Sequence, residues 1–396
     1  MTRNRTLLLA SVLVLAAAGV QLLVSGGHLF DLGVYRQGAV EVVRGTGQLY
    51  DFGIRGYPFT YPPAAALALT PLAFVPLVLL KVAWTVLLAP TLVLVWWVSF
   101  RAAERGHLRP WAPTGLLLAV AVAGSAVLLD PIERNFHFGQ VNLVLLLVVL
   151  LDLLGWVGEG RRGLLTGLAA AFKLTPLVFL LFLALTRQWR ALRNAVLAFA
   201  GAAAAGFVVL PGESWRYWTD LVVHTSRIGP LDRSSNQSVM GLLLRLGAQQ
   251  GASSTTLVWF LLAGALGAAG TALAVLCWRR GEELLAVSLV GLVSLLASPI
   301  SWTHHWVWCI PLGVGLASAT RRWTGSARAG WIAAAGWWAV FVAAPQKHVP
   351  QGTPVELLLG SSYLLVSTAL MAYVAWQLLV REPVRRTDAA SVGASR

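Results

Sequence analysis

Apolar runs about as long as a membrane is thick alternate with short basic clusters along most of the chain. A helix needs about 20 apolar residues to cross the hydrocarbon core of a bilayer. The sequence therefore predicts an all-α polytopic membrane protein. The apolar runs lie near residues 7–24, 77–100, 113–129, 139–157, 164–186, 191–210, 256–278, 284–298, 305–320, 329–344 and 357–380.

The basic clusters orient these segments, because loops rich in Lys and Arg stay in the cytoplasm. The loop before residue 61 is expected outside and the cluster after residue 100 inside, so the chain must cross the membrane an odd number of times in 61–100. The prolines in 62–76 make this stretch a poor regular span. It is therefore expected to lie as a helix at the outer interface, with one crossing after it. The run 164–186 lies between two cytoplasmic clusters, and the motif FKLTP at 172–176 interrupts it. This predicts two short, broken helices with Lys173 at their outer apex. We expect about twelve segments with both termini inside. The clusters are Arg3/Arg5, Arg101/Arg105/Arg109, Arg161/Arg162, Arg187/Arg190/Arg193, Arg279/Arg280, Arg321/Arg322/Arg328 and Arg381/Arg385/Arg386/Arg396.

The predicted organisation is one integral membrane domain over 1–380, followed by a disordered cytoplasmic tail over 381–396. Two long loops, 25–62 and 211–255, are expected outside the membrane, together with the short turns 130–138, 299–304 and 345–356. The N-terminal run also has the basic start and the apolar stretch of a signal peptide. It extends to Val24 without a clear cleavage site, so a first membrane span is the preferred interpretation.

Composition excludes the soluble and the disordered classes. Hydrophobic residues make up 57% of the 396 residues and charged residues only 12%, where a soluble domain has about 25% charged residues. The net charge of +14 lies largely in the basic clusters, which indicates membrane orientation rather than nucleic-acid binding. Cys277 and Cys309 both fall within apolar runs, so neither a disulfide framework nor zinc-ligand spacing is present.

The first outer loop contains the most unusual polar residues. Residues 31–44 have the spacing of a short amphipathic helix, which Gly45 and Gly47 would end. Asp31 comes a few residues after the first span, and an ionisable residue at that depth is a candidate functional group. The alternative is that Asp31 caps the helix. Glu41 and Asp51 are expected to be solvated or to lie in turns.

Other polar islands fall on the same predicted side of the membrane. They cover 130–142 and 298–306, and together with Lys173 and the first loop they bring acids, cations and imidazoles toward one face. His304 and His305 could instead belong to an interfacial aromatic belt, and Lys173 could snorkel. A metal site is not expected, because adjacent histidines cannot easily share one ion. Residues 236–238 match a glycosylation sequon, but a polar loop contact is preferred.

These islands carry a resemblance that covers residues 28 to 320. The chain resembles glycosyltransferase family 87, the polyprenol-phosphate-mannose-dependent α-(1→2)-mannosyltransferases of actinobacterial envelopes. The motifs that carry it are Asp31-Leu32-Gly33-Val34-Tyr35, Leu49-Tyr50-Asp51, Phe59-Thr60-Tyr61-Pro62-Pro63, Gly139-Gln140-Val141-Asn142, Phe172-Lys173-Leu174-Thr175-Pro176, Asn236-Gln237-Ser238 and Ser298-Pro299 through His304-His305.

The resemblance implies a GT-C membrane fold, an extracytoplasmic active site in the plasma membrane, and Asp31 as the catalytic acid of the first outer loop. Conversion of a β-mannosyl phosphate into an α-mannoside requires a single displacement with one carboxylate as general base. Lys173, one histidine of the 304/305 pair and Arg134 are the cations expected to neutralise the departing phosphate. The expected donor and substrate contacts are Lys173, His304, His305, Arg134, Arg36, Tyr61, Gln140, Asn142 and Asn236.

The expected partners are the lipid-phosphate sugar donor, a mannosylated lipid acceptor and membrane lipids, with no cofactor, no metal and no nucleic acid. The chain has no Asp-x-Asp motif, which argues against a nucleotide-sugar enzyme that holds its donor through a metal. Two alternatives stay open. One is an arabinofuranosyltransferase that uses polyprenol phosphate. The other is a transporter or flippase of lipid-linked sugars, for which Asp152 would need a charge partner inside the membrane.

Overall fold

The structure, a computed structural model, describes residues 9–17, 19, 28–54, 56–105, 115–224, 228–350 and 352–380. The predicted tail 381–396 and the first basic cluster lie outside these residues. The chain order is α2 (Phe30–Arg44), β1 (Gly53–Ile54), β2 (Tyr57–Pro58), α3 (Pro63–Leu69), η1 (Thr70–Phe74), α4 (Leu77–Glu104), α5 (Gly115–Leu128), α6 (Asp130–Phe138), α7 (Asn142–Leu153), α8 (Leu164–Phe172), η2 (Thr175–Leu177), α9 (Val178–Leu185), α10 (Trp189–Val209), α11 (Pro211–Arg216), η3 (Tyr217–Leu221), α12 (Val239–Arg245), α13 (Ser253–Arg279), α14 (Glu283–Ala297), η5 (Thr303–Trp308), α15 (Cys309–Thr324), α16 (Ala327–Ala343), η6 (Pro345–Lys347), α17 (Pro354–Leu359) and α18 (Ser362–Val380).

The fold is that of a mostly helical membrane protein. In the described part of the chain, five helices are long and apolar enough to cross a membrane, namely α4, α10, α13, α16 together with η6, and α18. A sixth results if α6 and α7, which are bent by 117°, count as one broken span. The expected count of about twelve segments is not confirmed, because helices such as α14 and η2 with α9 are apolar but short.

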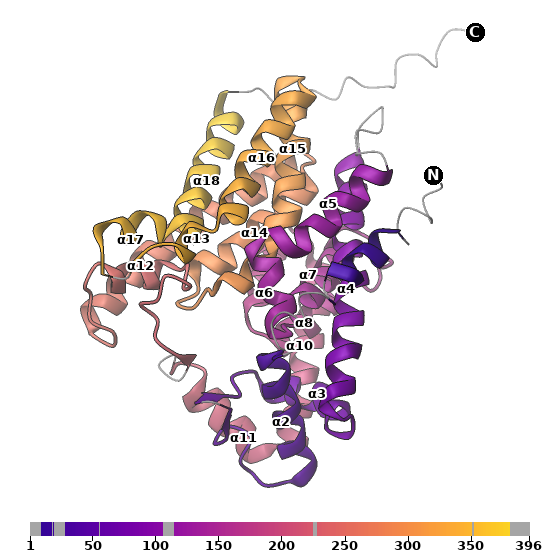
Figure 1. Ribbon diagram of the computed structural model, residues 1–396, viewed down its shortest axis with the longest axis vertical. Coiled ribbons are helices and arrows are strands. Elements are labelled where there is room, and N and C mark those ends of the chain that lie inside the picture. The colour runs from indigo at the N-terminus through magenta and orange to yellow at the C-terminus, as the bar shows by residue number, and fades with distance from the viewer. Residues whose placement is uncertain are drawn as a thin grey trace.

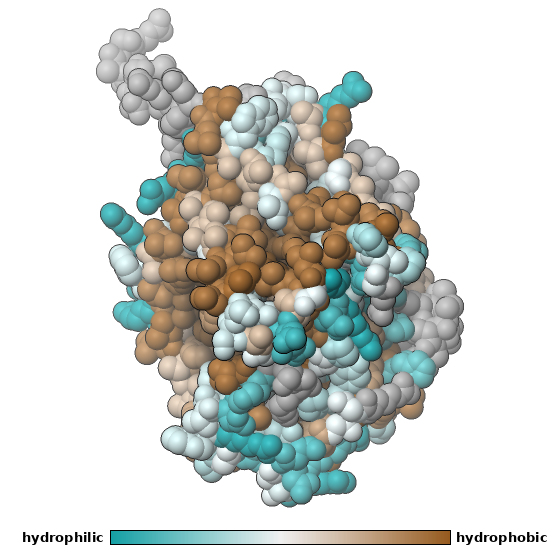
Figure 2. Space-filling model, turned by 90° about the vertical axis from the view of Figure 1, so that its left-hand side faces the viewer, coloured by the Kyte–Doolittle hydropathy of each residue, from teal (hydrophilic) through white to brown (hydrophobic). Residues whose placement is uncertain are grey.

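The outer faces of several helices are apolar. Leu257, Phe260 and Leu261 of α13 are each about three-fifths exposed. Figure 2 shows a broad hydrophobic surface across the upper and middle part of this side, and a mostly hydrophilic lower end. Exposed apolar area of this extent is typical of helices that face lipid rather than water.

The interior is formed by helices that are apolar on all faces. α14 is buried from Leu284 to Leu296 and packs between α13 and α15. α8 packs closely on α10 because Gly163 and Gly167 carry no side chain where the carbonyls of Ala191 and Ala195 approach. Small residues at a helix interface allow this close approach inside a membrane protein.

The helix of the first outer loop, α2, lies at one end of the molecule, whereas α6 lies nearer its middle (Figure 1). Figure 1 shows α2, α3 and α11 at its lower end, and α2 packs on α3 and η1. The predicted helix 31–44 is confirmed as α2, and it ends at Gly45 in the left-handed conformation with φ 62°.

Residues 130–138 differ from the prediction, which treated them as a turn. They form the helix α6, which ends at Gly139 with φ 70°. A Cβ at Gly139 would lie 2.9 Å from Leu32 Cβ. Only glycine therefore lets the end of α6 close against α2. The predicted turn 345–356 likewise contains η6 and α17.

Candidate active site

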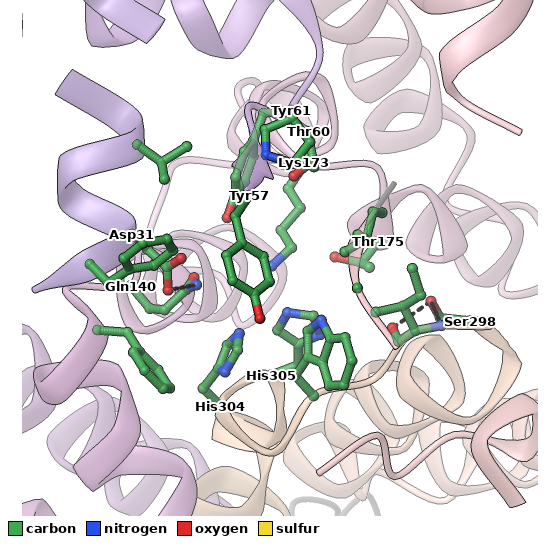
Figure 3. Close-up of a pocket in the computed structure, with 18 of the residues that line it drawn as sticks. Asp31, Tyr57, Thr60, Tyr61, Gln140, Lys173, Thr175, Ser298, His304 and His305 are labelled. Atoms are coloured by element: carbon green, nitrogen blue, oxygen red, sulfur yellow. Dashed lines mark hydrogen bonds between the residues drawn. The ribbon is translucent and has the colours of Figure 1, made fainter. Parts of the chain in front are cut away.

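A cavity of about 760 Å³ is lined by residues from segments that are far apart in the chain. Its wall combines α2, β2, α6, the break between α8 and η2, η3 and η5. Figure 3 shows Lys173 reaching into it from the side opposite His304 and His305, with Asp31 beside Gln140. The sequence-predicted residues that line the cavity are Asp31, Tyr61, Arg134, Gln140, Lys173, His304 and His305.

Asp31 lies in the first turn of α2 but does not cap it. The N-cap residue is Leu29, and no side chain caps this helix. The Oδ2 atom of Asp31 accepts a hydrogen bond of 2.6 Å from Gln140 Nε2 instead. The capping alternative is therefore wrong. The helix dipole still favours a negative charge in this first turn.

Burial sets the acid strength of Asp31. Removal from water raises its pKa to about 6, although the hydrogen bond from Gln140 and the charge of Lys173 act in the opposite direction. A carboxyl group with this pKa is ionised at neutral pH and is still basic enough to accept a proton. Those are the two properties that a general base needs.

A chain of hydrogen bonds links Asp31 to Lys173. Gln140 Oε1 accepts from the Tyr35 hydroxyl at 3.0 Å and from Asn142 Nδ2 at 3.3 Å. Asn142 Oδ1 then accepts from Lys173 Nζ at 2.7 Å. Asn142 is buried and is not part of the cavity wall. It therefore holds the ammonium group in place from behind.

Tyr61 joins this network from the segment that follows the β-hairpin. Its hydroxyl lies 2.8 Å from the Tyr35 hydroxyl. Its ring centre lies 5.6 Å from Lys173 Nζ, a distance at which the ring face attracts a cation. The ring thus forms one side of the ammonium site.

The break in 164–186 lies where the sequence predicts it. α8 ends at Phe172, Lys173 has an extended backbone, and η2 begins at Thr175. Pro176 cannot continue a helical hydrogen-bond ladder, because it lacks an N–H group. The break turns the Lys173 side chain into the cavity, as Figure 3 shows.

His304 and His305 lie in η5, and their rings meet edge to face at 4.6 Å. The His304 carbonyl accepts hydrogen bonds from Asn135 at 2.7 Å and from Asn142 at 3.0 Å, which fix the segment. Burial lowers the pKa of both imidazoles well below the usual value, and the charge of Lys173 acts in the same direction. Neutral imidazoles form hydrogen bonds but bring no positive charge. The positive charge expected from this pair must therefore come from Lys173 and Arg134.

Arg134 reaches the cavity from α6. Its Nε donates a hydrogen bond of 2.8 Å to Asp130 Oδ1. Its guanidinium lies 6.0 Å from the Phe138 ring centre, and that ring meets His304 edge to face at 5.4 Å. Arg134 and Lys173 are thus two cationic groups in the wall of one cavity.

Besides Asn142, two predicted binding residues are not among those that line the cavity. Arg36 Nε donates to the Val75 carbonyl at 3.0 Å and ties α2 to the end of η1. Asn236 is fully buried. Its amide donates to the Pro299 carbonyl at 3.2 Å and accepts from the Ser301 N–H at 2.9 Å. Both side chains fix loops through backbone groups.

The cavity also contains residues that the sequence did not single out. Among them are His28, Tyr57, His224 and Arg233. Tyr57 stands on the β-hairpin and projects into the middle of the view in Figure 3. His224 and Arg233 belong to the loop 211–255. The predicted position of this loop outside the membrane is the sequence signal that could have indicated them as site residues. Within the ranges described, no three His, Cys, Asp or Glu side chains group as a metal site.

Asp152, the acid on which the transporter alternative depends, caps a helix. Its Oδ1 accepts from the Gly163 N–H at 2.9 Å. Its Oδ2 accepts from the Thr166 N–H at 2.9 Å and from the Thr166 hydroxyl at 2.6 Å. These groups lie at the start of α8, where backbone N–H groups lack helical partners. The carboxylate thus has a structural function.

Comparison with known proteins identifies the family. The model of glycosyltransferase family 87 matches residues 59–299, which is more than half of the chain. The chain belongs to glycosyltransferase family 87. The resemblance carried by the motifs is therefore confirmed, and the protein is a glycosyltransferase. The matched range includes Gln140 and Lys173, whereas Asp31 precedes it and His304 and His305 follow it.

Curated relatives cover most of the chain. The polyprenol-phosphate-mannose-dependent alpha-(1-2)-phosphatidylinositol mannoside mannosyltransferase of Mycobacterium tuberculosis (strain ATCC 25618 / H37Rv) is 37% identical over 74% of this chain and 72% of its own length. The protein of the same name from Mycolicibacterium smegmatis is 34% identical over 88% of this chain and 83% of its own length. A pentamannoside mannosyltransferase with the same donor, from Mycobacterium tuberculosis (strain CDC 1551 / Oshkosh), is 33% identical over 84% of this chain and 77% of its own length. No solved structure matches the chain significantly.

Proposed function

We propose that this protein transfers mannose from polyprenol-phosphate-mannose to a hydroxyl group of a mannosylated phosphatidylinositol lipid, and that it forms an α-(1→2) linkage. The names of the relatives support this donor and this class of acceptor. The observation in the structure that carries the proposal is the hydrogen-bonded chain from the Asp31 carboxylate to the Lys173 ammonium in one cavity. A base and a phosphate-binding cation are the two groups that the reaction needs.

The reaction is a single displacement with inversion. The acceptor hydroxyl attacks the anomeric carbon of a β-linked mannosyl phosphate and forms the new C–O bond. The bond between that carbon and the phosphate oxygen breaks, and the lipid phosphate leaves with the bonding electrons. Asp31 takes the proton of the hydroxyl as general base. The raised pKa of Asp31 suits this step, because a carboxylate with the usual, lower pKa is a weaker base and accepts the hydroxyl proton less readily.

The leaving phosphate gains charge in the transition state. Lys173 and Arg134 line the cavity and stabilise that charge, in surroundings where water does not screen it fully. His304 and His305, as neutral imidazoles, and Tyr61 and Gln140 serve as hydrogen-bonding partners for the sugar and the phosphate. Arg36, Asn142 and Asn236 shape the site from outside the cavity wall.

The membrane arrangement completes the proposal. We infer a GT-C fold with about twelve membrane segments, of which 62–76 lies at the outer interface. The cavity then opens on the extracytoplasmic side of the plasma membrane. Membrane lipids surround the apolar faces, and both substrates reach the site from the outer leaflet.

A transfer assay tests the proposal. The protein is purified in detergent and given radiolabelled polyprenol-phosphate-mannose with a panel of mannosylated phosphatidylinositol acceptors. We expect labelled product whose new linkage an α-(1→2)-mannosidase cleaves, and we expect the Asp31→Asn variant to form it about 10²–10⁴-fold more slowly. A second arm contains polyprenol-phosphate-arabinose. Transfer of arabinose without transfer of mannose would overturn the proposal in favour of the arabinofuranosyltransferase.

A further inference from the structure

The buried carboxylate of Asp130 lies behind the Arg134 wall of the cavity and accepts four donors. Oδ1 accepts from Arg134 Nε at 2.8 Å and from Lys347 Nζ at 2.6 Å. Oδ2 accepts from the Tyr363 hydroxyl at 2.8 Å and from Gln346 Nε2 at 3.1 Å. The side chain is only 1% exposed. The four donors compensate the cost of burying the carboxylate.

The occupation of both oxygens decides how Arg134 is held. Arginine commonly binds a carboxylate through two parallel N–H bonds, one to each oxygen. Here Lys347 shares Oδ1, while Tyr363 and Gln346 fill Oδ2. The guanidinium is therefore held through Nε, and its Nη groups make no hydrogen bond to another described residue. These N–H groups belong to a side chain that lines the cavity.

We propose that Asp130, Lys347 and Tyr363 are positioning residues, which present the Nη groups of Arg134 to the phosphate of the lipid donor. The proposal rests on the proposed function, because that function makes a sugar phosphate the donor. A guanidinium presented edge-on can bind two phosphate oxygens at once. Tyr363 and Gln346 occupy Oδ2 and so keep Asp130 from drawing Arg134 into a two-point contact that would use up one of these edges, while Lys347 shares Oδ1.

Two of the positioning residues, Lys347 and Tyr363, come from the C-terminal part of the chain. Lys347 ends η6 and Tyr363 is the second residue of α18. Both lie beyond the residues 59–299 that the family model matches. The Tyr363 N–H also donates to Gln237 Oε1 at 2.9 Å, and the Gln237 N–H donates to the Ser301 carbonyl at 2.8 Å. One turn of α18 thereby supports both the α6 wall and the segment before η5.

Two conservative variants test the proposal by steady-state kinetics. Tyr363→Phe removes one hydroxyl group, and Lys347→Met removes a charge while it keeps the length of the side chain. We expect each to raise KM for the polyprenyl-phosphate-mannose donor about tenfold, the size of effect that one hydrogen bond to a charged group has. The turnover number should fall as well, because Arg134 also stabilises the charge on the leaving phosphate, whereas KM for the glycolipid acceptor should stay close to the wild-type value. Lys347→Arg should restore most of the donor affinity.

A double variant separates positioning from general support. In an Arg134→Ala background, Tyr363→Phe should not raise the donor KM further, because its effect passes through Arg134. Tyr373→Phe is the matched control on the same helix, where the hydroxyl pairs with Thr320 at 3.2 Å away from the cavity. It should leave both KM values unchanged.

The outcomes decide between the explanations. Full additivity of Tyr363→Phe with Arg134→Ala would overturn the proposal, as would equal changes in kcat and in both KM values. Thermal unfolding of each variant shows that it is folded, and if one variant is not recovered folded, the other decides by the same criteria. A wild-type protein without mannose transfer refutes the proposed function instead. Binding of polyprenyl phosphate alone, weaker in Tyr363→Phe than in wild type, then still tests the positioning of Arg134.

Discussion

Gln140 and Asp31 share a hydrogen bond of 2.6 Å, which the amide Nε2 donates to the carboxylate Oδ2. The other carboxylate oxygen, Oδ1, has no hydrogen-bond partner among the residues that the structure describes. The acid is thus oriented through one oxygen and open to the cavity through the other. This arrangement suits a base that must accept a proton from a substrate, and it leads to the first predictions.

Asp31→Asn should lower the rate of mannose transfer by about 10²–10⁴-fold, the usual effect of removing a general base. The amide oxygen of asparagine can still accept the hydrogen bond from Gln140, so the fold of the site is retained. Initial rates with saturating donor and acceptor measure the effect. Activity within a few-fold of wild type would remove Asp31 from the mechanism.

The same variant should be more stable than wild type at neutral pH. Burial raises the pKa of Asp31 from 3.8 to about 6, so the fold disfavours the ionised form. Below about pH 3 the carboxyl group is protonated in the folded protein and largely so in the unfolded chain, and the two proteins should unfold alike. As pH rises from about 4 to about 6, wild type should lose stability relative to the variant, and at higher pH the difference should stay constant. Melting curves in detergent from about pH 3 to pH 8 test this, and a variant less stable at pH 8 would contradict it.

The pH dependence of kcat/KM should report the titration of Asp31. Below about pH 6 the base becomes protonated, and kcat/KM should fall about tenfold for each pH unit. Gln140→Ala removes a hydrogen bond that lowers the pKa of Asp31, so its acidic limb should move to higher pH. An unshifted limb in this variant would indicate that another group titrates.

Lys173→Ala should lower kcat more than it raises KM for the lipid donor. The ammonium interacts most strongly with the phosphate when that group gains charge on departure. Lys173→Arg should rescue activity only partly, because the guanidinium keeps the charge but not the shape. Lys81→Ala on α4 is the control. Equal losses from Lys173→Ala and Lys81→Ala would indicate general destabilisation.

Labelling of single cysteines should place the loop 25–62 outside the cell. Gln48 is exposed and follows Gly47, whose φ of 68° makes Gly47 itself a poor position for substitution. Gln48→Cys should react with a reagent that cannot cross the membrane, and Glu159→Cys should react only after permeabilisation. Cys277 and Cys309 are buried and should give little background. The opposite labelling pattern would invert the topology and move the cavity to the cytoplasmic side.

The sequence predicted those parts of the fold that local chemistry determines. α2 begins within one residue of the expected start and ends where Gly45 adopts a left-handed conformation. The break at Lys173 follows from Pro176, which cannot take part in the helical ladder. Both features depend only on neighbouring residues, so one sequence was enough to predict them.

The parts that the sequence did not predict depend on distant partners. α6 was taken for a turn, although Pro131 near its start and Gly139 at its end are ordinary helix signals. Arg36 and Asn236 have the polarity of binding residues, but distant backbone carbonyls take up their donors. Whether a polar side chain faces a ligand or a loop is decided by tertiary packing, which a single sequence does not reveal.

The spread of the site along the chain has a consequence for biosynthesis. Asp31 leaves the ribosome near the start of synthesis, whereas Tyr363, which completes the partners of Asp130, leaves it near the end. A nascent chain therefore holds Asp130 in the translocation machinery or the bilayer before its C-terminal partners exist. The cluster around Asp130 can therefore assemble only after α18 has been synthesised, and until then the Arg134 wall of the cavity lacks two of its supports.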